Sequence, residues 1–186
     1  MKKALIMFLG VPGSGKSYFA KKLAKKIDAV RLNGDSMRVA IWGSIDKVES
    51  ARSKGKNVNR KAFRAIDYAA IEILRSGNSV IYDAHHNKFE VREKLANLAR
   101  EFEAIPIVVY IKTPPEIAKE RALSRDPVDQ VKFDSELWQK VYDQQMLNFS
   151  EPDVSENVIE IDGTLDFSDQ YHDFLQQFNK LNKEAK

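Results

Sequence analysis

Short apolar runs alternate along the chain with longer stretches in which apolar residues recur at helical spacing. The apolar runs are rich in branched and aromatic residues, a composition that favours strands. They predict strands at residues 4–9, 29–32, 80–82, 105–111 and 158–161. The amphipathic stretches predict helices at residues 17–27, 59–76, 88–102, 115–123, 135–149 and 168–181.

Two of the predicted helices carry clear signals for their start or their inward face. Helix 59–76 is expected to begin after an N-cap at Asn59, because asparagine accepts hydrogen bonds from first-turn N–H groups. Helix 88–102 is expected to bury the stripe formed by Val91, Leu95, Leu98 and Phe102, whose spacing places them on one face.

The order of these elements predicts the fold class. Strands that are apolar throughout and separated by helices indicate a parallel sheet covered on both faces. We therefore expect a three-layer α/β fold in which a five-stranded parallel sheet has helices on both faces. Residues 1–186 are expected to form a single domain, and the polar, irregular stretch within 121–135 is expected to form a lid.

Composition narrows the class of protein. The chain has 186 residues, no cysteine and no apolar run of 18 residues, so we expect neither disulfides nor a membrane span. The apolar N-terminal run leads directly into a glycine-rich octet without a small-residue cleavage site, which argues against a signal peptide. These features fit a cytoplasmic protein.

The net charge of +3 conceals a strong asymmetry. Residues 1–64 hold 16 lysines and arginines against 4 acidic residues, whereas residues 65–186 hold 14 against 23. Charge segregation of this size suggests that the basic part meets an anionic partner.

The octet GVPGSGKS follows the first predicted strand and opens the first predicted helix. It satisfies the pattern G-x-x-x-x-G-K-[ST], in which glycines let successive backbone N–H groups point at phosphate oxygens. Lys16 would lie near the β- and γ-phosphates, and the Ser17 hydroxyl would be a ligand of Mg²⁺. A plain glycine-rich turn is the alternative. The expected nucleotide-binding residues are Gly10, Val11, Pro12, Gly13, Ser14, Gly15, Lys16, Ser17 and Tyr18.

A carboxylate and an arginine follow the second predicted strand. Loops at the carboxyl ends of parallel strands meet at the ligand crevice, so Asp35 and Arg38 should lie near the phosphate loop. Asp35 could accept the proton of an attacking hydroxyl, and Arg38 could steady a phosphate of the substrate. The alternative is that Asp35 only caps a helix beginning near Ser36 while Arg38 is solvated.

The third predicted strand ends in Asp83, which is followed by Ala84, His85, His86 and Asn87. A carboxylate at this place could bind Mg²⁺ through water or orient a substrate. His85 or Asn87 could face the substrate, although simple loop polarity also explains them. A metal site on the paired histidines is disfavoured, because no further ligand residue lies at a suitable spacing.

Arg121 and Arg125 flank the start of the predicted lid. A lid arginine that closes over ATP could contact the nucleotide and neutralise developing charge, a catalytic role we assign to Arg125. The alternative is an exposed helix on which Arg121 pairs with Glu116 or Glu120.

A segment without acidic residues, 51–64, lies on the acceptor side of the predicted crevice. It could contact the phosphate backbone of single-stranded nucleic acid, or it could be an exposed basic loop. Near the C-terminus, residues 160–164 read as a strand-end turn near the nucleotide base, since too little chain follows for a phosphatase domain. The basic residues of 51–64 are Arg52, Lys54, Lys56, Arg60, Lys61 and Arg64.

Together these motifs resemble the small P-loop kinases of adenylate-kinase-like fold, and among them the polynucleotide 5′-hydroxyl kinase-like proteins. The resemblance spans most of the chain and implies a P-loop NTPase fold with ATP and Mg²⁺ as cofactors. It also implies that Asp35 is the general base, that Arg38 binds the reacting phosphate, and that Lys16 and Ser17 hold ATP and Mg²⁺.

Two departures from that family lie on the acceptor side. Ser36 stands where the family often repeats the aspartate, and Ala84-His85 stands where it often has Thr-Asn. The stretch L-N-G-D-x-x-R is also similar to the L-D-G-D-x-x-R of adenylylsulfate kinases, which phosphorylate a small molecule.

The sequence therefore predicts an ATP- and Mg²⁺-dependent kinase. Its first candidate acceptor is a nucleic acid 5′-hydroxyl, and the alternative is a nucleoside, an adenylylsulfate-like compound or another metabolite. A nucleotide-binding regulatory ATPase without an acceptor is the competing class. No membrane partner is expected, and the oligomeric state stays open.

Overall fold

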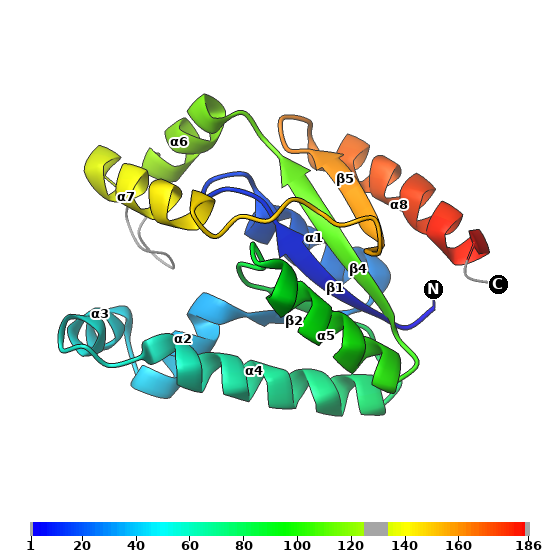
Figure 1. Cartoon of the computed structure of the whole chain (residues 1–186), viewed down its shortest axis with the longest axis horizontal. Helices are drawn as coiled ribbons and strands as arrows, with labels where there is room; N and C mark the ends of the chain where they lie inside the picture. Colours follow the sequence, from blue (N-terminus) through cyan, green and yellow to red (C-terminus); the bar gives the residue numbers. More distant parts are fainter. Residues whose placement is uncertain (1, 125–133, 185–186) are drawn as a thin grey trace.

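Five parallel strands form the centre of the molecule (Figure 1). The computed structural model describes residues 2–124 and 134–184. The strands are β1 (Ala4–Leu9), β2 (Val30–Asn33), β3 (Val80–Asp83), β4 (Ile105–Lys112) and β5 (Val158–Asp162), and they lie in the order β2-β3-β1-β4-β5. Because β1 lies between β3 and β4, the order of connection reverses beside it, which is where open parallel sheets bind ligands.

Helices cover both faces of this sheet, as the pattern of apolar runs predicts. Within the described residues they are α1 (Lys16–Ile27), α2 (Gly34–Trp42), α3 (Ile45–Ser53), α4 (Val58–Arg75), α5 (Phe89–Glu101), α6 (Pro115–Leu123), α7 (Ser135–Met146) and α8 (Phe167–Glu184). None of them is both long enough and apolar enough to cross a membrane.

Alternate residues of β1 enter two separate cores. Ile6 and Phe8 pack with residues of α1 and α8 on one face, including Phe19 and Phe174. Leu5 and Met7 point to the other face, where the buried side chains of α4 and α5 meet them. A strand that is buried on both faces must be apolar at every position, which explains the uninterrupted run ALIMFL.

Two details of the predicted helices are wrong. Helix α4 begins at Val58 and its N-cap is Asn57, whose side chain accepts a hydrogen bond from the N–H of Arg60. Two asparagines close together offer two possible caps, and the pattern alone favoured the wrong one. Helix α3 was not predicted at all; it begins after Ser44, whose hydroxyl accepts from the N–H of Lys47.

Helix α5 buries most of the predicted stripe, because Leu95 is in the core and Leu98 and Phe102 pack against it, but the prediction is wrong at one end. Val91 is 41% exposed, whereas Arg92 is fully buried together with Leu95, Ala96 and Ala99. An arginine is almost never buried without a partner, so apolar spacing alone could not predict the burial of Arg92 in place of Val91.

The partner of Arg92 is the carboxylate of Glu156, which lies before β5. Nε of Arg92 is 2.8 Å from Oε1 of Glu156, and Nη1 donates to the carbonyl of His86 at 3.0 Å. The same guanidinium donates to the carbonyls of Ser150 and Glu151. Arg92 thereby holds the segment between α7 and β5 against the loop that follows β3.

We expect Glu156→Gln to lower the free energy of unfolding by about 3 kcal/mol, because it leaves the buried charge of Arg92 without a counter-ion. Glu72→Gln is the matched control, since Glu72 pairs with Arg75 on the surface of α4 and such pairs contribute about 0–1 kcal/mol. Urea denaturation of both variants measures the two losses. Equal losses would show that the Arg92–Glu156 pair does not anchor the fold.

Candidate active site

The phosphate loop lies between β1 and α1 and depends on its glycines for shape. Gly13 and Gly15 have φ angles of 89° and 102°, in the left-handed region that side chains disfavour. A Cβ atom at Gly13 would lie 1.9 Å from the carbonyl oxygen of Ala118, so only glycine lets α6 approach the loop this closely. Around Gly15 no atom lies within 4 Å of such a Cβ, which leaves open space at the start of α1.

The side chain of Lys16 folds back inside the phosphate loop and bonds to its backbone. Its ammonium donates to the carbonyls of Gly10 at 2.8 Å and Val11 at 2.7 Å, and the residue is only 7% exposed. The N-cap of α1 is Gly15, which has no side chain to offer the first-turn N–H groups. A loop with a buried ammonium and an N-terminal helix end open to solvent is suited to an anion. Tyr18 differs, because its hydroxyl accepts from Lys22 on the exposed side of α1.

The turn after β5 packs against the phosphate loop. The hydroxyl of Thr113 donates to the carbonyl of Ser14 at 2.9 Å, and a Cβ at Gly163 would lie 2.8 Å from that same oxygen. Arg121 donates to the carbonyl of Gly163 at 2.6 Å. Arg121 is therefore held beside the loop, and the predicted pairing with Glu116 or Glu120 does not occur in the described structure. Arg125, the other predicted lid arginine, lies outside the described residues.

Asp83 ends β3 and is the most heavily bonded carboxylate of the site. The hydroxyl of Ser17 donates to its Oδ1 at 2.9 Å. Its Oδ2 accepts from Nε of Arg31 at 2.8 Å and from Nδ2 of Asn33 at 2.8 Å. Asp83 is 4% exposed, so water cannot solvate its charge. These hydrogen bonds take the place of that water.

Arg31 was not among the residues expected in the site. It lies on β2 two residues before Asn33, and strand residues two apart share a face. Asn33 pairs with Asp83 in the sheet register, so both β2 side chains lie beside the end of β3. An arginine in a strand of four residues, two positions before a polar strand end, was the available signal.

Asn33 also connects this carboxylate to α2. Its Oδ1 accepts from the N–H of Ser36 at 2.9 Å and from the hydroxyl of Ser36 at 3.0 Å, so Asn33 is the N-cap of α2. The alternative in which Asp35 caps this helix is therefore wrong. The side chain of Asp35 is 54% exposed in the first turn, where a substrate can reach it.

Arg38 is not a solvated side chain. Its guanidinium lies 2.5 Å from Oδ1 of Asp35 and 3.0 Å from Oδ1 of Asn59, and it is 14% exposed. Asn59, predicted as an N-cap, instead joins α4 to α2 through this arginine. The structure thus brings Asp35 and Arg38 together, as the sequence predicts.

The residues after Asp83 divide between surface and interior. His85 is exposed, whereas His86 is 2% exposed and its Nδ1 accepts from the N–H of Phe8 at 3.3 Å. Asn87 is 6% exposed and its Nδ2 donates to Gln145 of α7 at 3.4 Å. Of the two residues expected to face a substrate, only His85 has an accessible side chain.

Burial keeps His86 neutral. Desolvation, assisted by the charges of Arg92 and Lys16, lowers the pKa of His86 to about 3, against a smaller opposing effect of the hydrogen bond with the Phe8 backbone. Its Nε2 has no hydrogen-bond partner within the described part of the chain. His86 therefore supports β1 and the loop after β3, rather than exchanging protons near neutral pH.

The basic segment 51–64 is not a loop. It runs from the end of α3 through a turn into α4. In Figure 1, α3 lies on the same side of the molecule as α6 and α7, and α4 runs away from it along the lower edge. Arg52 pairs with Glu49 at 2.6 Å. Lys56 and Lys61 lie over the ring of Trp42, at 5.6 and 5.4 Å from its centre. Part of this charge is thus engaged within the helices.

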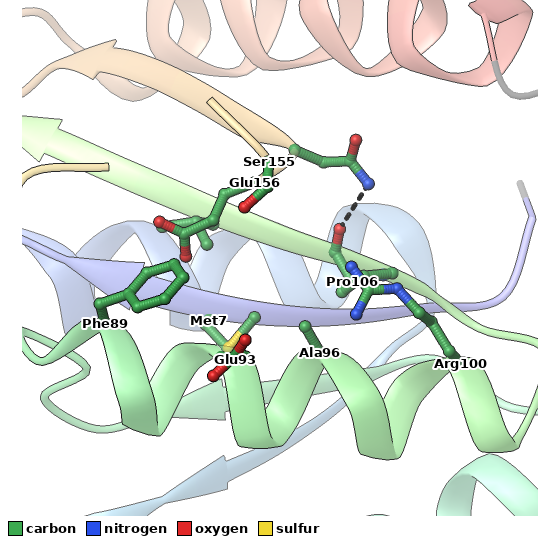
Figure 2. Close-up of a pocket in the computed structure, with 10 residues that line it drawn as sticks. Met7, Phe89, Glu93, Ala96, Arg100, Pro106, Ser155 and Glu156 are labelled. Carbon is green, nitrogen blue, oxygen red and sulfur yellow. Dashed lines mark hydrogen bonds between the residues drawn. The ribbon is translucent and has the colours of Figure 1, made fainter. Parts of the chain in front are cut away.

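A separate cavity of about 190 Å³ lies between α5, β4 and the turn before β5 (Figure 2). Met7, Ala96 and Pro106 contribute apolar surface, and Asn157 donates to the carbonyl of Pro106 at 3.0 Å. Ligand pockets usually measure roughly 300–1,000 Å³, and none of the lining residues belongs to the phosphate loop or α2. This cavity is therefore not the candidate active site.

The oxygen atoms of Ser17 and Asp83 fit the preference of Mg²⁺ for hard ligands. Among residues 2–124 and 134–184, no group of three or more histidines, aspartates or glutamates could hold a metal ion. Mg²⁺ in such sites takes its other ligands from water and substrate phosphates.

Comparison with known proteins assigns this geometry to a class. The AAA_33 family model, described as an AAA domain, matches residues 5–152, so the chain belongs to this P-loop kinase family. An adenylate kinase of Kosmotoga olearia is 30% identical over 128 residues, which cover 64% of this chain and 58% of that protein. The match thus spans less than two thirds of that relative.

Solved structures share the fold at low sequence identity. A gluconokinase from Sinorhizobium meliloti 1021 aligns with 99% of this chain and 95% of its own, with a TM-score of 0.69 at 18% identity. A sugar kinase from Janibacter sp. HTCC2649 covers 95% of both chains, with a TM-score of 0.67 at 18% identity. The P-loop NTPase fold expected from the sequence is therefore confirmed.

We expect Gly13→Ala to weaken binding of a non-hydrolysable ATP analogue at least tenfold, because the new methyl group would collide with the carbonyl of Ala118. Gly77→Ala is the control: its φ of 87° carries the same backbone strain, but nothing lies within 4 Å of the added atom. Isothermal titration calorimetry measures both affinities. Similar affinities in the two variants would refute the steric argument.

His86 should make the protein less stable in acid. Between pH 6.5, its ordinary pKa, and about 3 the unfolded chain binds a proton that the folded chain does not, so stability falls as the pH falls. The slope is about 1.4 kcal/mol per pH unit. In His86→Asn, which retains an acceptor near Nδ1, the free energy of unfolding should depend less on pH between 6 and 4.5. His172→Asn, at an exposed position of α8, should keep the wild-type slope.

Proposed function

We propose that the protein transfers the γ-phosphoryl group of ATP to a hydroxyl group of a small molecule. One observation carries the proposal: Asn33 donates to Asp83, the bonding partner of Ser17, and accepts from Ser36 beside Asp35. The phosphate loop and the first turn of α2, which carries Asp35, are thus joined by hydrogen bonds.

The phosphate loop would hold the nucleotide. Free backbone N–H groups of the phosphate loop and of the first turn of α1, together with the ammonium of Lys16, would face the phosphates. Arg121, held at Gly163, would contact the nucleotide. Ser17 and Asp83 would hold Mg²⁺, which when bound offsets charge on the β- and γ-phosphates. Arg125 would neutralise the charge that develops during transfer, which is the catalytic role that the sequence predicts for it.

Asp35 and Arg38 would act on the acceptor side. Asp35 accepts the proton of the acceptor hydroxyl while the oxygen of that hydroxyl bonds to the γ-phosphorus. The bond from that phosphorus to the bridging oxygen breaks, and ADP leaves with the electron pair. Arg38, held by Asn59, offers its positive charge to the transferring group or to an anionic group of the acceptor.

A small acceptor fits better than a nucleic acid. The similar proteins are described as an adenylate kinase, a gluconokinase and a sugar kinase. Lys56 and Lys61 lie on Trp42 and Arg52 is paired, so half of the basic segment is engaged. The nucleic acid 5′-hydroxyl remains the second candidate because Lys54, Arg60 and Arg64 are exposed.

The direct test is to incubate the protein with Mg²⁺, [γ-³²P]ATP and a panel of acceptors. The panel should hold nucleosides, nucleoside monophosphates, sugars, sugar acids, adenylylsulfate and a 5′-hydroxyl oligonucleotide. We expect label on one small-molecule class. Label on the oligonucleotide alone would replace the small acceptor with a nucleic acid, and label only in free phosphate would support a regulatory ATPase.

With the acceptor identified, Asp35→Asn should lower kcat by about 10²–10⁴-fold, the usual range for general-base catalysis, and leave ATP affinity unchanged. The amide retains the size of the side chain but cannot take the proton. Asp46→Asn is a matched control, because Asp46 occupies the first turn of the neighbouring helix α3. A fall in kcat of less than about tenfold would exclude Asp35 as the base.

A further inference from the structure

Arg31 neutralises Asp83 before any ligand arrives. Two of its nitrogens, Nε at 2.8 Å and Nη2 at 2.5 Å, donate to the same carboxylate oxygen. The side chain of Asp83 is 3% exposed and that of Arg31 is 25% exposed, so water screens this pair only in part. The other oxygen of Asp83 remains directed at Ser17.

The position of Arg31 indicates that its role is tied to this carboxylate. Arg31 pairs in register with Ile81, whose side chain belongs to the core beneath α1 and α8. Its own strand is at the edge of the sheet, where an apolar residue could cover the same core. An arginine at this place contributes a cation next to the residues that fit Mg²⁺, Ser17 and Asp83.

A fixed cation changes what a carboxylate can bind. Like charges a few ångströms apart repel strongly where solvent is excluded, so a divalent ion approaching Asp83 meets the charge of Arg31. Nucleotide phosphates bring several negative charges to the same place and reverse this balance. We propose that the charge of Arg31 weakens the binding of divalent cations to Asp83, so that metal enters the site only together with the nucleotide. This proposal rests on the proposed use of Mg²⁺ and ATP.

The test measures metal binding without nucleotide and without turnover. Mn²⁺ is the probe, because electron paramagnetic resonance counts the free ion directly. Arg31→Gln should raise the affinity for Mn²⁺ roughly tenfold or more over wild type, the scale on which outer-shell partners alter metal sites. Arg31→Lys keeps the charge and should stay near wild type. With a non-hydrolysable ATP analogue bound, the difference in Mn²⁺ affinity between Arg31→Gln and wild type should become smaller.

Two further variants locate the effect. Asp83→Asn, added to Arg31→Gln, should remove the gained affinity. Arg75→Gln breaks an exposed arginine–glutamate pair on α4 and should leave Mn²⁺ binding unchanged. The proposal is overturned if folded Arg31→Gln, checked by circular dichroism, binds Mn²⁺ like wild type, or if Arg31→Lys gains as much affinity as Arg31→Gln.

If Arg31→Gln does not fold, the Mn²⁺ affinity of the wild-type protein with and without the ATP analogue tests the proposal. Nucleotide-free wild type that binds Mn²⁺ as tightly as its analogue complex, through a site lost in Asp83→Asn, would contradict the proposal. Weak binding that the analogue strengthens supports it. Because no acceptor is present, a failure of the proposed phosphoryl transfer leaves this result unaffected.

Discussion

The buried carboxylate of Asp83 joins the separate parts of the candidate active site. It ends β3, and it accepts hydrogen bonds from Ser17 at the start of α1 and from Arg31 and Asn33 on β2. A buried charge is stable only when its hydrogen-bonding capacity is filled, so these partners are held in place by the cost of leaving Asp83 unpaired. The phosphate loop and α2 therefore have a defined relative position before a substrate binds.

Close packing around the phosphate loop adds a second constraint. Gly13 lies against the carbonyl of Ala118 in α6, and Gly163 lies against the carbonyl of Ser14. Both contacts exclude a Cβ atom, so α6 and the turn after β5 pack directly against the loop. A nucleotide that changes the conformation of the loop would therefore also displace α6 and the turn after β5, to which Arg121 is hydrogen-bonded.

The fold class and the phosphate loop were predictable because each has a local signal. Apolar runs report strands buried on both faces, and the spacing of Gly10, Gly15, Lys16 and Ser17 reports a phosphate-binding loop. The pairing of Asp35 with Arg38 followed from helical spacing, which brings residues three apart to one side.

Contacts between distant segments could not be predicted in this way. Arg31 and Asp83 are 52 positions apart, and Arg92 and Glu156 are 64 apart, so no periodicity relates them. Their burial depends on the strand register and on the path of the chain before β5. The contact of Asn59 with Arg38 was likewise not predictable, because the two residues lie on different helices.

The most direct measurement of the central claim is the Mg²⁺ dependence of ATP-analogue binding in Asp83→Asn and Asp162→Asn. Both aspartates end parallel strands at the same edge of the sheet, but Asp162 bonds to Thr164 in its own turn. If Asp83 organises the site, Asp83→Asn loses roughly 10–100-fold in metal-dependent affinity, the range typical of residues that support a metal. Asp162→Asn should retain the wild-type value. Wild-type affinity in Asp83→Asn, measured by calorimetry at several Mg²⁺ concentrations, would contradict the account.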